Sequence, residues 1–168
     1  MANLHTRTLG RTGLEVTTLG FGAMELRGAP RGRDITPEQA ERVLNGVLDG
    51  GVNYIDTSID YGSSEELIGR FISHRRSEYY LATKCGCTDT WPYRNSSEHI
   101  WTRDNLFRAL EVSLRRLRRD RVDIMQLHNP TVRECEDGGL VGALEEMRRQ
   151  GKVRWIGIST LLPDLPTY

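Results

Sequence analysis

Four polar residues each close, or soon follow, a segment with the pattern of a β-strand: Asp56, Tyr61, Lys84 and His128. Their side chains are a carboxyl, a phenol, an ammonium group and an imidazole, which are groups that move protons in enzymes. In a barrel of parallel strands, the carboxyl ends of the strands converge on one face, where the chemistry collects. We therefore expect these four groups to meet in space despite their separation in the sequence.

Strand and helix patterns alternate along the chain, after a short hairpin expected at 6–18 around a glycine-bearing turn. Thr36, Pro37 and Gln39 have the spacing of a capped helix start. A long polar loop is expected at 85–100. Strands are expected at 19–22, 53–56, 79–84, 122–128 and 153–159, and helices are expected to begin at Thr36, Ser64, Thr102 and Leu140.

This alternation indicates an α/β fold with a parallel sheet and right-handed crossovers. Two architectures compete, a doubly wound open sheet and a (β/α)₈ barrel of the TIM type. A complete barrel takes about 250 residues, whereas this chain has 168. We expect one domain over 1–168, with the hairpin and about five of the eight β/α units, as an incomplete barrel truncated after strand five.

Composition limits the classes of function. The chain has 23 basic and 23 acidic residues, and this balance argues against a generally cationic surface for nucleic acid or membranes. No stretch approaches the roughly 18 continuous apolar residues of a membrane span. An odd number of cysteines, three, without framework spacing favours reduced thiols and a cytoplasmic location.

Five segments together resemble one known family. The run N-Y-I-D-T-S-I-D-Y-G-S-S-E at 53–65 is similar to the aldo-keto reductase signature, and L-A-T-K at 81–84, D-I-M-Q-L-H at 123–128 and V-R-W-I-G-I-S at 153–159 agree with the family in order and spacing. The opening at 9–22 resembles the family's N-terminal hairpin. The likeness implies reduction of an aldehyde or ketone to an alcohol with a nicotinamide cofactor, NADPH, and a small-molecule carbonyl substrate.

The resemblance implies a catalytic tetrad. Tyr61 would give a proton to the substrate oxygen, although a tyrosine with a pKa near 10 releases its proton reluctantly. An ammonium group at about 4 Å supplies roughly 4 kcal/mol at an effective dielectric constant near 20, so Lys84 is expected to lower that pKa. Asp56 would keep Lys84 charged and aimed. His128 would hydrogen-bond the substrate oxygen and orient it.

The resemblance also places residues at the cofactor. In the family, a Ser-Asn pair after the fifth strand binds the nicotinamide carboxamide, and here the pair is Ser159-Thr160, which loses the two-ended amide. Backbone and small groups after the first strand would lie near the cofactor as well. The residues expected to bind it are Gly22, Ala23, Met24, Asp56, Ser159 and Thr160.

Other interpretations remain open. A half barrel leaves an unpaired sheet edge, so the chain could be a non-catalytic fragment or an interaction protein that self-associates through that edge. A Schiff-base enzyme that uses Lys84 is a third, less favoured reading. Cys85, Cys87 and His99 lack a second Cys or His pair, so free cysteines are favoured over zinc and no metal site is predicted. The basic run at 115–121 is interpreted as a solvated helix end.

Overall fold

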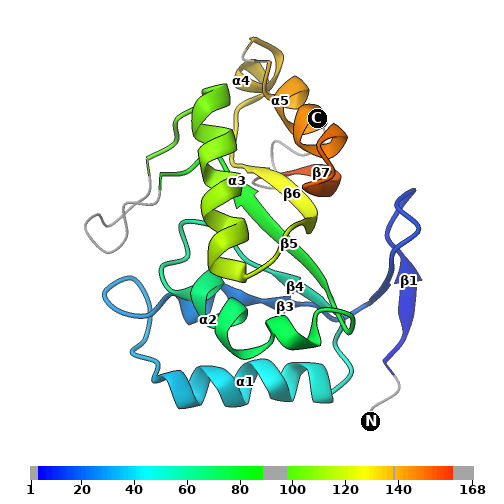
Figure 1. Cartoon of the computed structure of the whole chain (residues 1–168), viewed down its shortest axis with the longest axis vertical. Coiled ribbons are helices and arrows are strands. Elements are labelled where there is room, and N and C mark those ends of the chain that lie inside the picture. Colours follow the sequence, from blue (N-terminus) through cyan, green and yellow to red (C-terminus); the bar gives the residue numbers. More distant parts are fainter. Residues whose placement is uncertain (1–3, 89–97, 138, 161–168) are drawn as a thin grey trace.

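The computed structural model describes residues 4–88, 98–137 and 139–160 of the chain (Figure 1). The chain begins with the predicted hairpin, in which β1 (Thr6–Thr8) pairs antiparallel with β2 (Glu15–Thr17). Asn53 ties this hairpin to the start of the sheet, because its side chain accepts from the amide of Thr17 at 2.7 Å. No helix in the described part of the chain has the length and apolar character needed to cross a bilayer.

Five parallel strands form the sheet, and each strand lies beside the next one in the sequence. The strands are β3 (Phe21–Gly22), β4 (Tyr54–Asp56), β5 (Tyr80–Cys85), β6 (Val122–His128) and β7 (Val153–Ser159). A doubly wound sheet changes direction at a switch point, whereas this order runs in one direction only. The sheet is therefore an arc of a barrel, and this decides between the two predicted architectures.

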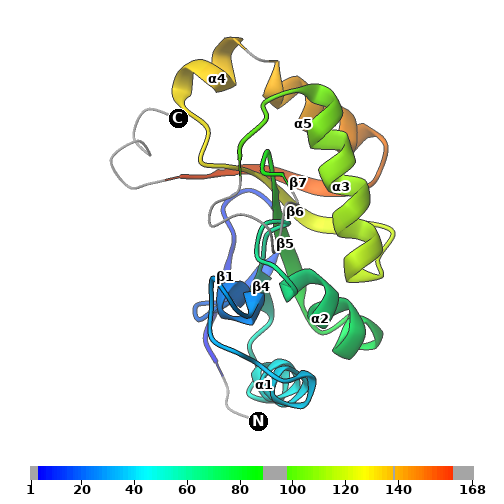
Figure 2. The same cartoon turned by 90° about the vertical axis from the view of Figure 1, so that its left-hand side faces the viewer.

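Helices alternate with the strands as predicted. They are α1 (Pro37–Asp49), α2 (Ser64–Phe71), α3 (Arg103–Leu117) and α5 (Leu140–Arg149), with 3₁₀ turns η1 (Ala23–Arg27) and η2 (Ser73–Arg75) and a short α4 (Val132–Asp137). Figure 2 shows α2, α3 and α5 side by side along one face of the sheet. The predicted capping box at Thr36 and Gln39 is confirmed at the start of α1.

The short α4 was not predicted, although the sequence contains a signal for it. Thr131 precedes the helix, and its hydroxyl accepts from the amide of Glu134 at 3.2 Å. The Glu134 carboxylate accepts in return from the amide of Thr131 at 2.7 Å. This is the reciprocal pattern of a Thr-x-x-Glu capping box. The sequence also favours a helix start at Pro163, and that segment lies outside the described residues.

The two faces of the sheet bury different partners. Ile55, Leu81 and Met125 point outward into the main core with the helices. Ala82 and Ile124 point to the inner face, where Leu14 of the hairpin region packs against them. Because successive strand residues alternate between faces, the residues two positions beyond the inner ones also face inward. The hairpin covers the start of the inner face, and the polar residues occupy its far end.

Candidate active site

Strand register brings the predicted residues to one end of the inner face. Asp56 is paired with Ala82 on β5, and Lys84, two positions further, is paired with Gln126 on β6. His128 ends β6 and is paired with Ser159 at the end of β7. All these inward positions lie at the carboxyl ends of parallel strands, which is where a barrel places its chemistry.

Lys84 is the centre of this site. Its side chain is only 4% exposed, and its ammonium group is in close ionic contact with Asp56. Nζ also donates to the carbonyl oxygen of Thr57 at 2.8 Å and to the Tyr61 hydroxyl at 3.5 Å. The second carboxylate oxygen of Asp56 accepts from Gln126 Nε2 at 3.0 Å. Lys84 is thus fixed between a carboxylate and the phenol that would transfer a proton.

Tyr61 differs from the sequence-based expectation in the direction of its pKa. Burial raises the pKa of the Tyr61 phenol above its ordinary value, Lys84 opposes this increase, and the negative charges of Asp56 and Asp60 add to it. The net pKa is raised, so the expected lowering is wrong in direction. The sequence-based argument weighted the ammonium charge above the burial of the phenol, which is the largest cause, and did not count the negative charges of Asp56 and Asp60. Tyr61 accordingly stays protonated at neutral pH, as a proton donor must.

His128 is held by a polar network on the other side of Tyr61. Its Nδ1 lies 3.1 Å from Cys87 Sγ, 3.4 Å from Ser58 Oγ and 3.4 Å from Asp60 Oδ1. Its ring meets the Tyr61 ring edge-on, with centroids 5.9 Å apart. These contacts orient the imidazole ring. When Nδ1 accepts the hydrogen bond of the Cys87 thiol, the ring proton lies on the opposite nitrogen, Nε2, which can donate it.

Asp60 is a functional candidate that the sequence analysis missed. Its carboxylate accepts from Ser58 Oγ at 2.5 Å, and one of its oxygens lies 3.8 Å from Arg31. Burial raises the pKa of Asp60, but the hydrogen bond and charge of His128, the Ser58 hydroxyl and Arg31 together lower it to about 2. Asp60 is therefore ionised at any physiological pH. Its position directly before Tyr61 was the only sequence signal.

The loop that carries Tyr61 is anchored at several points. Ser64, the first residue of α2, donates to the carbonyl oxygen of Ala23 at 2.9 Å and lies 2.9 Å from the hydroxyl of Thr57. Arg116 of α3 donates to the carbonyl oxygen of Ile59 at 3.1 Å. These contacts link the loop to η1, α2 and α3. The phenol of Tyr61 is consequently positioned by the helical layer as well as by the strand.

The residues expected at the cofactor lie on both sides of this site, at the ends of the outermost strands β3 and β7 of the described sheet. Gly22 and Met24 are exposed, whereas Ala23 is fully buried and uses its carbonyl oxygen to bind Ser64. Ser159 and Thr160 are half-buried at the end of β7. A Cβ on Gly22 would meet no atom within 4 Å, so there is open space at that strand end.

A cavity of about 590 Å³ lies at the opposite end of the strands, near Tyr80, Asp123 and Arg154. Asp123 accepts there from the backbone amide of Leu81 at 3.0 Å and from Arg154 at 2.8 Å. These contacts hold neighbouring strands together at their amino ends. In barrels this end contributes to stability, whereas the carboxyl ends carry the chemistry. The candidate active site is therefore the group of residues around Lys84 at the carboxyl ends of the strands, and not this cavity.

Comparisons with known proteins agree with this geometry. Residues 18–164 match the sequence profile of the aldo/keto reductase family. The uncharacterised oxidoreductase YqkF of Bacillus subtilis is 31% identical over 166 residues, which are 96% of this chain and 51% of that protein. L-galactose dehydrogenase of Arabidopsis thaliana is 33% identical over 180 residues, which cover 100% of this chain and 52% of that protein.

A solved structure of an aldo-keto reductase is also similar to this chain. The holo form of an aldo-keto reductase from Bacillus halodurans superposes with a TM-score of 0.85 and 31% identity, covering 98% of this chain and 53% of that one. The chain thus spans about half the length of the relatives that it matches. Within that half, the parallel sheet and its order are those of the family's barrel. The chain belongs to the aldo/keto reductase family.

Proposed function

We propose that the chain provides the proton-transfer site of an oxidoreductase that reduces an aldehyde or ketone to an alcohol with a nicotinamide cofactor, NADPH. The observation that carries this proposal is the continuous contact from Asp56 through Lys84 to the Tyr61 hydroxyl, with His128 beside the same phenol. Three strand ends would hardly assemble these four groups for packing alone, because a buried ammonium group is costly to desolvate.

The chain's own residues would act as follows. His128 donates from Nε2 to the substrate oxygen and fixes the carbonyl beside Tyr61. The bound cofactor supplies a hydride to the carbonyl carbon. Tyr61 gives its hydroxyl proton to the oxygen as negative charge develops there, and Lys84 stabilises the tyrosinate that remains. Asp56 keeps Lys84 in position throughout. The alcohol forms with one hydride and one proton added.

The strand ends on both sides of the tetrad suit a nicotinamide cofactor. The hydroxyls of Ser159 and Thr160 can donate to or accept from a carboxamide. Gly22 and Met24 offer exposed backbone and a flexible apolar side chain on the opposite side. These residues would hold the nicotinamide end, with Asp56 beside them on the inner face. The preference for NADPH over NADH is part of the proposal and is supported by the family alone.

The direct test is an initial-rate measurement. The purified chain is mixed with NADPH and a series of aldehydes and ketones, and loss of the reduced cofactor's absorbance is followed. Tyr61→Phe should reduce the rate by about 10²–10⁴-fold, which is the usual contribution of a positioned proton donor. Tyr79→Phe removes a phenol that contacts the Ile72 carbonyl instead, and it should keep the wild-type rate. Equal rates in wild type and Tyr61→Phe would contradict the assigned role.

We also propose a cytoplasmic location. Cys85, Cys87 and Cys135 are all free thiols, and a reducing compartment keeps them so. Cell fractionation followed by detection of a tagged form of the chain tests this location. We expect the tagged chain in the cytoplasmic fraction, and its recovery from an oxidising compartment would contradict the proposal.

A further inference from the structure

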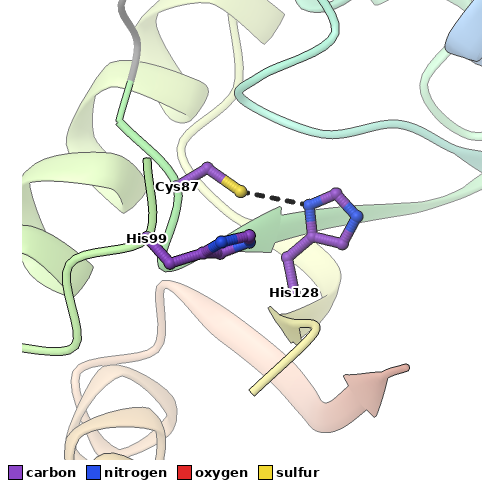
Figure 3. Close-up of side chains that lie close together, drawn as sticks. All are labelled: Cys87, His99 and His128. Atoms are coloured by element: carbon purple, nitrogen blue, oxygen red, sulfur yellow. Dashed lines mark hydrogen bonds between the residues drawn. The ribbon is translucent and has the colours of Figure 1, made fainter. Parts of the chain in front are cut away.

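A thiol and two imidazoles meet beside the proposed active site (Figure 3). The Sγ of Cys87 and one ring nitrogen each of His99 and His128 all lie within 4.8 Å of one another. Figure 3 shows the sulfur of Cys87 directed at the His128 ring, with the ring of His99 alongside. The spacing in the sequence does not reveal this group, because His128 comes from a different strand.

The backbone fixes two of these residues relative to each other. Cys87 and His99 form an antiparallel β-bridge, which is continued by hydrogen bonds from Thr88 to Glu98 at 2.8 Å and from Ile100 to Gly86 at 2.8 Å. Cys87 follows β5 and His99 precedes α3, so the bridge closes the base of the connection between them. The bridge therefore places the side chains of Cys87 and His99 next to each other on one short β-ladder.

The two imidazoles are also held in place. The ring of His99 stacks on Trp101 at a centroid distance of 5.5 Å and an interplanar angle of 15°. The ring of His128 packs edge-on against the rings of Tyr61 and His99, with centroid distances of 5.9 Å and 6.1 Å. Ligands whose orientation is fixed by neighbours lose little entropy when they bind a metal, and such outer contacts raise metal affinity.

The chemistry of the group fits zinc. Zinc binds thiolate sulfur at about 2.3 Å and imidazole nitrogen at about 2.0–2.1 Å, so two ligand atoms of one tetrahedral ion lie about 3.4–3.6 Å apart. The three ligand atoms all lie within 4.8 Å of one another, and side-chain movements of about 1 Å bring them to that spacing. Cys87 Sγ and His128 Nδ1, at 3.1 Å, already lie close to it. The carboxylate of Asp60 beside His128 adds negative charge that favours a divalent cation.

We propose that Cys87 Sγ, His99 and His128 Nδ1 bind a zinc ion, with a water molecule as the fourth ligand. Three protein ligands with one open position are a recurrent zinc arrangement. Zinc displaces the Cys87 thiol proton into solvent and bonds to the thiolate. Bound at Nδ1, it leaves the His128 proton on Nε2, so the metal fixes the tautomer that faces the substrate side. This site goes beyond the proposed reductase activity and does not depend on it.

Cobalt titration of the purified chain tests the site without any activity readout. We expect one cobalt ion per chain, with a thiolate-to-cobalt charge-transfer band and the visible bands of four-coordinate cobalt, both removed by competing zinc. Cys87→Ser and His99→Gln should each weaken binding by about 100-fold or more, since even outer contacts to a ligand contribute 10–100-fold. His99 is exposed, so His99→Gln keeps the test valid if Cys87→Ser does not fold.

Two matched variants serve as controls. Cys85→Ser removes a thiol that contacts the carbonyl oxygen of Gln126, and His74→Gln removes an exposed imidazole in η2. Both should bind cobalt as the wild type does, and zinc should raise the melting temperature of wild type and controls only. Absence of the thiolate band in the wild type, or equal binding by His99→Gln and His74→Gln, would overturn the proposal.

Discussion

At the residue scale, the ammonium group of Lys84 has three donors, and the structure supplies an acceptor for each of them. They are the carboxylate of Asp56, the carbonyl oxygen of Thr57 and the hydroxyl of Tyr61. A buried ammonium group with every donor satisfied is fixed in direction. The role of Lys84 is therefore to stabilise the tyrosinate formed during proton transfer. It does not keep Tyr61 deprotonated beforehand, because the pKa of the free phenol is raised.

Asp60 gives a prediction about acid stability. Its pKa is lowered from 3.8 to about 2, so between those values the unfolded chain binds a proton that the native chain does not. Stability is then fully present above the unfolded pKa and is lost as pH falls toward about 2, by roughly 2 kcal/mol. In Asp60→Asn, the free energy of unfolding should fall less over this range. Urea unfolding at a series of pH values measures it.

The control for this measurement is Asp34→Asn, which replaces an exposed carboxyl. It should show the wild-type decline in the free energy of unfolding with falling pH. An Asp60→Asn variant whose decline equals that of the wild type would show that the network around His128 contributes nothing to acid stability.

How far the site could be predicted depends on the type of contact. Asp56, Tyr61, Lys84 and His128 could be placed from the sequence because each stands at or after a strand end. Most of their partners could not, because contacts between strands depend on register, which single-strand patterns leave open. Gln126 is the exception, because it lies two positions before His128 and so faces the same side. The contact between Cys87 and His128 could not be predicted, because the two residues belong to different strand ends.

At the element scale, α2 and α3 approach each other closely at Gly69. A Cβ at this position would lie 2.0 Å from the backbone carbonyl oxygen of Arg116. The same stretch of α3 carries the Arg116 side chain that binds the loop before Tyr61. Gly69 therefore sets the distance between the two helices and, through Arg116, supports the position of the catalytic loop.

Gly69→Ala should destabilise the chain by about 1–3 kcal/mol, because backbone must move to accept the methyl group. Gly46→Ala is the matched control, since Gly46 lies inside α1 with no atom within 4 Å of an added Cβ. Helix propensity alone should make that variant more stable by about 0.5–1 kcal/mol. Thermal unfolding of both variants measures the two effects, and destabilisation of equal size in both would refute the contact argument.

The elements themselves were largely predictable, and the exceptions have a physical reason. The strands show apolar runs, the main helices show apolar residues at helical spacing, and α1 and α3 begin at capping threonines, so their types follow from local pattern. Only the order of the sheet distinguishes a barrel arc from a doubly wound sheet, and that order is set by long-range packing. The short turns η1, η2 and α4 have too few residues to show a periodicity.

At the scale of the whole molecule, the sheet has two outer strands, β3 and β7. In the described part of the chain, β7 pairs with β6 alone. Its other edge presents backbone donors and acceptors over Val153–Ser159, and such edges pair with further strands. Half-buried apolar residues of the same strand, including Trp155 and Ile158, lie against the core. We propose that two copies of the chain associate through this edge.

Sedimentation velocity over a wide concentration range tests this association. The average sedimentation coefficient should rise with concentration and should change little with salt, because strand pairing and apolar contact are weakly screened. A single monomeric species at every concentration would exclude the edge as an interface.

Direct detection of hydride transfer is the measurement that tests the central claim most closely. The chain is incubated with an aldehyde and NADPH carrying deuterium at the transferred position, and the alcohol is analysed by mass spectrometry. We predict one deuterium on the carbinol carbon with the wild type and with Tyr79→Phe, and a loss of about 10²–10⁴-fold with Tyr61→Phe. Absence of labelled alcohol with the wild type, or equal labelling with Tyr61→Phe, would contradict a reductase site built on Tyr61, Lys84, Asp56 and His128.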